Sequence, residues 1–185
     1  WLARRSVNLP DHACFMQRRP EGRRCAVFPH KKRKIMEKLY FEDFQPGMRF
    51  ETATRTLTAD DIAGFARQHD PQPFHLDARL AEHSVFAGLA ASGWQTATTS
   101  MRLVVDLLAD RVAGGLVGMQ VDKMRWPRPT RPGDTLKVTL EVLKAKRSTT
   151  QPEFGVVGWR WTTTNQAGET AMTLENAIWV PCRPH

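Results

Sequence analysis

A single change of hydrophobic period constrains the fold of this chain more than any other feature. Residues 92–112 carry apolar side chains at helical spacing, and beyond them the apolar positions recur with a period close to two. The four segments of period two are 116–129, 134–147, 154–164 and 169–180. We therefore expect an α+β domain in which an antiparallel sheet, completed by an earlier strand over 47–58, wraps one long central helix.

The predicted central helix is apolar over most of its circumference, which predicts burial on most of its sides. The apolar stripe and the two leucines that widen it are Trp94, Ala97, Met101, Val104, Val105, Leu108, Leu103 and Leu107. Arg102 and Asp106 lie one turn apart and mark a polar edge. The glycines of segment 113–115 are expected to end the helix.

The segment 70–76 holds two titratable groups beside two prolines. Pro71 and Pro73 restrict the backbone, so we expect an extended and rigid segment rather than a helix. Such a segment would fix Asp70 and His75 relative to each other. The flanking segments expected to be helical are 58–69, which Thr58 caps with Asp61 in a capping box, and 77–83.

Composition excludes several classes of protein. No apolar run reaches the about 18 residues that a membrane helix requires, so we expect no membrane partner. Cys14, Cys25 and Cys182 are odd in number and lack metal-ligand spacing, which favours a reducing, cytoplasmic location without disulfides. The sequence contains neither a metal-ligand cluster nor a glycine-rich phosphate loop, so we expect no metal and no cofactor.

The excess of basic over acidic residues is confined to the first 35 residues of the chain. The net charge of +8 resides entirely in residues 1–35, and residues 36–185 are neutral. We expect 1–35 to be a disordered extension of a domain that spans 36–185, with Met36 as the natural first residue. The alternative is a basic arm that binds nucleic acid or an anionic surface.

Four stretches carry a resemblance to a known family. "YFEDFQPGMRF", "DPQPFHLD", "FAGLAASGW" and "RWPRPTRPGDTL", in this order and spacing, resemble the MaoC-like dehydratases, a group with the hot-dog fold that includes (R)-specific enoyl-CoA hydratases. The family motif D-x-N-P-x-H stands here from Asp70 to His75, with Gln72 in place of the asparagine and Phe74 before the histidine. The His-Gly that the family carries at its helix start is Ser92-Gly93 here.

The resemblance implies that Asp70 and His75 are the catalytic pair and that the amide of Gly93 anchors the substrate carbonyl. The chemistry of these groups agrees, because a carboxylate and an imidazole held a few ångströms apart can share one water and accept its hydrogens. A backbone N–H at the start of a helix suits a developing oxyanion, and glycine there allows close approach of a thioester.

Five further residues are candidates for substrate binding. Phe74 and Trp94 adjoin the catalytic pair and the helix start, and Ser92 is either a helix cap or a hydroxyl of the site. Arg125 and Arg128, with Arg131, recur every third residue. These arginines either meet the phosphates of coenzyme A or are solvated charges at a strand end.

The preferred interpretation is a cofactor-free hydro-lyase of fatty acid metabolism, which hydrates an enoyl thioester of coenzyme A or of acyl carrier protein. The resemblance implies a homodimer paired through sheet edges, since an uncovered edge strand needs a partner. A hot-dog thioesterase is disfavoured because the helix offers only Asp106 and Asp110 as carboxylates, far from its first turn. A non-catalytic acyl-thioester-binding subunit is a third interpretation. A nucleic-acid binder, the fourth, depends only on residues 1–35.

Overall fold

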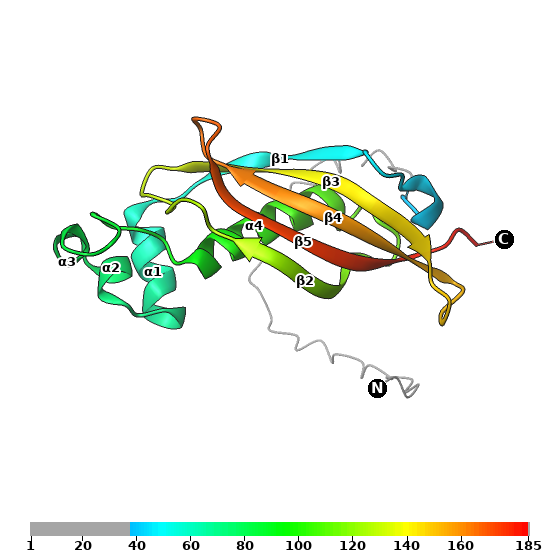
Figure 1. Ribbon diagram of the computed structural model, residues 1–185, viewed down its shortest axis with the longest axis horizontal. Coiled ribbons are helices and arrows are strands. Elements are labelled where there is room, and N and C mark those ends of the chain that lie inside the picture. Colours follow the sequence, from blue (N-terminus) through cyan, green and yellow to red (C-terminus); the bar gives the residue numbers. More distant parts are fainter. Residues whose placement is uncertain (1–37, 185) are drawn as a thin grey trace, which may run out of the picture. The chain divides into compact units, whose positions relative to one another are not determined.

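A five-stranded antiparallel sheet is the largest element of the computed structural model, which describes residues 38–184 (Figure 1). The strands are β1 (Arg49–Thr56), β2 (Val117–Arg125), β3 (Thr135–Arg147), β4 (Phe154–Thr164) and β5 (Thr170–Pro181). Their order across the sheet is β1-β3-β4-β5-β2. The predicted basic segment 1–35 and its boundary at Met36 lie outside the described residues.

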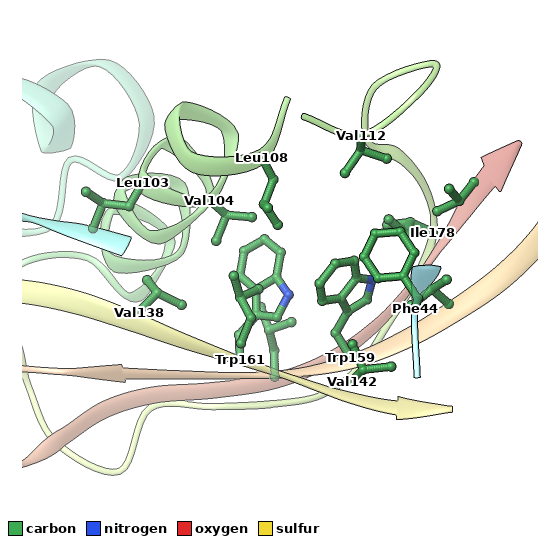
Figure 2. Close-up of a cluster of buried hydrophobic side chains, with 14 of the residues drawn as sticks. Phe44, Leu103, Val104, Leu108, Val112, Val138, Val142, Trp159, Trp161 and Ile178 are labelled. Carbon is green, nitrogen blue, oxygen red and sulfur yellow. The ribbon is translucent and has the colours of Figure 1, made fainter. Parts of the chain in front are cut away.

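The helix α4 (Gly93–Leu108) packs along one face of this sheet and forms the core with it. Alternate residues of β3 are buried, which gives the strand one face toward the helix. Figure 2 shows Leu108 and Val104 of α4 facing Trp159 and Trp161, which stand up from β4. The expected α+β architecture, one central helix against an antiparallel sheet, is confirmed.

The expectation about which side of α4 is buried is partly wrong. Trp94, Met101 and Val105 belong to the predicted buried stripe, yet they are 60%, 51% and 40% exposed. The buried side of the helix instead includes polar residues, among them Thr96 and Ser100. Their hydroxyls are satisfied locally, because each hydroxyl pairs with that of a buried threonine at 2.9 Å. The helix also ends at Leu108, one turn before its predicted end.

Three short helices lie beyond the end of the sheet at which α4 begins (Figure 1). They are α1 (Ala59–His69), α2 (Pro73–Leu76) and α3 (Ala78–Glu82), and a 3₁₀ turn, η1 (Phe41–Asp43), precedes β1. The Thr58 capping box with Asp61 is confirmed. The expectation that 70–76 is extended throughout is wrong, because proline fits the first position of a helix and Pro73 begins α2. Among residues 38–184, no helix is long and apolar enough to cross a membrane.

The strand β2 is an irregular edge of the sheet. It pairs only with β5, its register shifts twice, and Lys123 within it has a φ of +50°. Val117, Met119 and Val121 of this strand are exposed. Between β2 and the exposed stripe of α4 lies an apolar groove of about 360 Å³, the α4–β2 groove. The sheet therefore has an edge and an adjoining apolar surface that residues 38–184 leave uncovered.

Candidate active site

Asp70 and His75 come together where α1 ends and α2 begins. Asp70 is the C-cap of α1, and its N–H donates to the carbonyl of Ala66 at 2.9 Å. His75 lies in the single turn of α2 and is 4% exposed. The carboxylate Oδ2 of Asp70 and the imidazole Nε2 of His75 are 3.4 Å apart. This separation exceeds that of a strong direct hydrogen bond and allows one water to contact both atoms.

Two side chains hold the carboxylate of Asp70. The hydroxyl of Ser92 donates to Oδ2 at 2.6 Å, and the amide of Gln72 donates to Oδ1 at 2.7 Å. The Ser92 hydroxyl is the main reason that the pKa of Asp70 lies below its usual value, and Gln72 acts in the same direction against the effect of burial. The carboxylate is therefore kept ionised and oriented. Ser92 serves as both helix cap and site hydroxyl, since it also accepts from the N–H of Trp94 at 3.3 Å.

A backbone carbonyl sets the orientation of His75. The imidazole Nδ1 lies 2.7 Å from the carbonyl oxygen of Ala90, and a carbonyl can only accept. In a neutral ring the proton therefore sits on Nδ1, and Nε2 carries the free electron pair that faces Asp70. The N–H of Ala90 donates in turn to the carbonyl of Phe74 at 3.3 Å, which ties the two segments together.

Gly93 is the first residue of α4, and its N–H belongs to the turn that has no partner within the helix. The indole of Trp126 packs against the side of Gly93 on which a β-carbon would stand. A β-carbon on Gly93 would lie 2.9 Å from that ring, so glycine is required for this packing. Trp126 also meets Trp94 edge to face, with ring centroids 5.7 Å apart.

The catalytic candidates share a cleft of about 600 Å³, which we call the Asp70–Gly93 cleft. The predicted site residues that line it are Asp70, Phe74, His75, Ser92, Gly93, Trp94 and Arg128. Arg128 also pairs with Glu169 at 3.1 Å. Arg125 lies at the end of β2 and is not among the lining residues, so the structure does not bring it to the other candidates. Trp94 lines both this cleft and the α4–β2 groove.

Sequence reasoning missed three contributions to this site. Gln72 had been noted only as a departure from the family motif, and the structure shows its amide on the carboxylate of Asp70. Ala90 contributes a carbonyl, and nothing in a sequence distinguishes one backbone carbonyl from another. Trp126 covers Gly93 from a distant segment, for which the only signal was its place in a proline-rich stretch.

The arrangement suits proton transfer. The carboxylate of Asp70 and the Nε2 of His75 face each other beside a helix start that presents an N–H. Within residues 38–184, no group of three or more His, Cys, Asp or Glu side chains lies close enough to hold a metal ion. The cleft thus combines a carboxylate, an imidazole and a helix-start N–H, groups that are able to move a proton and to stabilise a developing oxyanion.

Comparison with known proteins identifies the family. The model of the MaoC like domain matches residues 43–165. The MaoC-like dehydratase from Rhodospirillum rubrum is 42% identical, with a TM-score of 0.75 over 80% of this chain and 99% of its own. The R-hydratase PhaJ1 from Pseudomonas aeruginosa is 26% identical, with a TM-score of 0.64 over 80% and 89%. The (R)-specific enoyl-CoA hydratase of Rhodospirillum rubrum is 29% identical over 78% of this chain and 93% of its own. The predicted hot-dog fold is confirmed, and the chain belongs to the MaoC-like domain family.

Proposed function

We propose that this protein adds water reversibly to the 2,3 double bond of an acyl thioester, with an enoyl-CoA as substrate and an (R)-3-hydroxyacyl-CoA as product. One observation carries the proposal: the Oδ2 of Asp70 and the Nε2 of His75 face each other at 3.4 Å, while Nδ1 is anchored on the carbonyl of Ala90. The (R) configuration follows the hydratase from Rhodospirillum rubrum and is part of the proposal.

The proposed reaction uses one water between the two side chains. The water donates one hydrogen to Oδ2 of Asp70 and the other to Nε2 of His75. As its oxygen bonds to C3 of the substrate, one proton passes to the pair, and the electrons of the double bond move toward the thioester oxygen. C2 then takes a proton from the pair, which restores the starting protonation state and yields the 3-hydroxy thioester.

The start of α4 serves the thioester oxygen in this proposal. The Ser92 hydroxyl accepts from the N–H of Trp94, so the cap leaves the N–H of Gly93 for the enolate oxygen. The indole of Trp126, which covers Gly93, would border the bound thioester. No cofactor is used, and coenzyme A enters only as part of the substrate. We propose that Arg128, which lines the cleft, meets its phosphates.

The thioesterase alternative gains no support from the site. It requires a carboxylate aimed at the thioester carbon, and Asp106 of α4 is instead exposed and paired with Arg102 at 2.8 Å. A non-catalytic thioester-binding subunit is disfavoured as well, because the carboxylate and the imidazole are both present, oriented and joined to the same cleft.

A homodimer is part of the proposal. One side of the edge strand β2 pairs with no other strand of the described residues, and the α4–β2 groove beside it is apolar. Pairing of two β2 edges in a dimer would continue the sheet and cover Met101 and Val121, which are 51% and 57% exposed. Trp94 borders this surface and the Asp70–Gly93 cleft, so the partner would lie close to the site.

The test is a panel of enoyl thioesters of increasing chain length, carried by coenzyme A or by acyl carrier protein. Loss of the absorbance of the conjugated thioester reports hydration, and chiral analysis of the product reports its configuration. We expect the enoyl thioesters to be hydrated to the (R)-3-hydroxy product. Release of free thiol without hydration would establish a thioesterase, and the absence of both reactions over the whole panel would contradict the proposal.

A further inference from the structure

The guanidinium of Arg131 donates to three backbone carbonyls. Its Nη1 donates to the carbonyl of Gly88 at 2.7 Å and to that of Leu89 at 3.1 Å, and its Nη2 donates to the carbonyl of Phe86. The side chain is half-buried in the wall of the Asp70–Gly93 cleft. Neither sequence-based interpretation of Arg131, a phosphate ligand or a solvated charge, describes these contacts.

The carbonyls that Arg131 binds belong to the segment that orients His75. Two residues beyond Gly88, the carbonyl of Ala90 accepts from Nδ1 of His75 at 2.7 Å. Earlier in the same segment, the ring of Phe86 lies 6.0 Å from the imidazole of His75, centroid to centroid. The imidazole of His75 therefore contacts segment 86–90 at both the Ala90 carbonyl and the Phe86 ring, and Arg131 binds this same segment.

Segment 86–90 lies outside regular secondary structure, and besides Arg131 it is held by single backbone bonds, such as those from the N–H groups of Gly88 and Ala90 to the carbonyls of Ala81 and Phe74. Ala87 and Gly88 have φ values of +49° and +137°, and the segment lies outside every helix and strand of residues 38–184. Three carbonyls of this half-buried segment converge on the one guanidinium, which supplies a donor to each of them. A planar guanidinium with several N–H groups can serve all three at once, whereas an ammonium cannot match their directions.

We propose that Arg131 is a positioning residue of the active site: its guanidinium fixes segment 86–90, and through the carbonyl of Ala90 it fixes the orientation and tautomer of His75. Arg131 itself does not touch the reacting atoms in this proposal. Its effect on turnover rests on the proposed hydratase function. Its effect on the imidazole of His75 does not, and the two are measured separately.

The experiment compares Arg131→Ala and Arg131→Lys with wild type and with Arg79→Ala. Arg79 is an exposed arginine of α3 and is the matched control. The ¹⁵N shifts of the His75 ring, assigned with His75→Gln, report the tautomer without any substrate. We expect the Nδ1–H tautomer in wild type and Arg79→Ala, and a mixture of tautomers in Arg131→Ala. Circular dichroism establishes that each variant is folded, and Arg131→Lys keeps the test available if Arg131→Ala does not fold.

Turnover is the second measurement. Arg131→Ala should lower kcat on the order of 10²-fold, as misplacement of a catalytic group does, with little change in KM. Added guanidinium ion should restore part of kcat in Arg131→Ala and none in wild type, and Arg131→Lys should restore little.

A rise in KM with unchanged kcat would show that Arg131 binds substrate, and an unchanged His75 tautomer would overturn the positioning role. If wild type hydrates no thioester, the proposed function fails, and the tautomer alone decides on Arg131.

Discussion

Replacement of Ser92 by alanine should lower the free energy of unfolding and raise the pKa of Asp70. The pH dependence of the stability loss distinguishes the lost helix cap from the lost hydrogen bond to Asp70. The Ser92 hydroxyl donates to Oδ2 of Asp70 at 2.6 Å and caps α4 through the N–H of Trp94 at 3.3 Å. Loss of a helix cap costs about 1 kcal/mol. A hydrogen bond to a charged group contributes about 1.5–3 kcal/mol, and the lower figure applies because water can reach the partly exposed Asp70. We expect a loss of about 2–3 kcal/mol in the free energy of unfolding at neutral pH.

The sign of the pH dependence follows from the direction of the shift. The Ser92 hydroxyl lowers the pKa of Asp70 in the folded protein, so its contribution is fully present above the unfolded value of about 3.9. That contribution is lost as the pH falls through the folded pKa. The gap between wild type and Ser92→Ala should therefore narrow below about pH 4, until only the cap term of about 1 kcal/mol remains.

Urea unfolding at fixed protomer concentration, repeated across pH, measures this gap. Ser100→Ala is the control, because Ser100 lies on the same helix and bonds only to neutral groups, the carbonyl of Thr96 and the hydroxyl of Thr163. Its effect on stability should not change with pH. The acid limb of the activity profile should move to higher pH in Ser92→Ala. If the stability gap of Ser92→Ala were as independent of pH as that of Ser100→Ala, the hydroxyl would not control the Asp70 carboxylate.

Three further predictions concern packing, assembly and the basic segment. Gly155→Ala should lower the free energy of unfolding by about 1–3 kcal/mol, because its β-carbon would overlap the ring of Phe41. Gly64→Ala, in open space within α1, should raise it by up to about 1 kcal/mol. Thermal unfolding measures both changes. Met101→Glu should dissociate the proposed dimer, as measured by light scattering. Leu80→Glu, at an exposed site on α3, should leave the dimer intact. A wild-type protein that is monomeric at micromolar concentration would contradict the proposed dimer. Residues 36–185 alone should match the turnover of the full chain at high salt, and a salt-independent loss of kcat/KM would show that residues 1–35 contribute to the domain.

The strands β3, β4 and β5 could be predicted from the sequence almost to the residue. The segments 134–147 and 154–164 correspond to β3 (Thr135–Arg147) and β4 (Phe154–Thr164). These strands are buried on one face, so alternation of apolar residues reports the contact directly. The edge strand β2 begins at Val117, one residue after its predicted start. It ends at Arg125, before the expected 129, and its pairing with β5 is irregular.

The faces of α4 could not be predicted in the same way. Hydrophobic periodicity identifies an apolar stripe, but it does not say which protein surface covers that stripe. Trp94 and Met101 are exposed in the single chain, and the buried side contains Thr96 and Ser100, whose hydroxyls find partners only in the folded structure. A helix that buries both apolar and hydroxyl side chains and leaves other apolar residues facing a groove can have the same composition as one that is buried all round.

The candidate site was partly accessible from the sequence. Asp70, His75 and Gly93 were identified through their motif and place, and the structure gathers them in one cleft. The contact of Ser92 with Asp70 spans 22 positions and depends on how α4 meets α1, which no local pattern encodes. The contacts of Arg131 likewise depend on the path of a loop.

The activity of Asp70→Asn and His75→Gln tests the central claim most directly. Each substitution removes one of the two groups proposed to share the water and should leave the fold intact. Each should lower kcat/KM for an enoyl-CoA by about 10²–10⁴-fold. The double variant should lose little more than either single variant, because the two groups act as one unit. Retention of half of the wild-type activity by Asp70→Asn would contradict the assignment of the base, and with it the proposed mechanism.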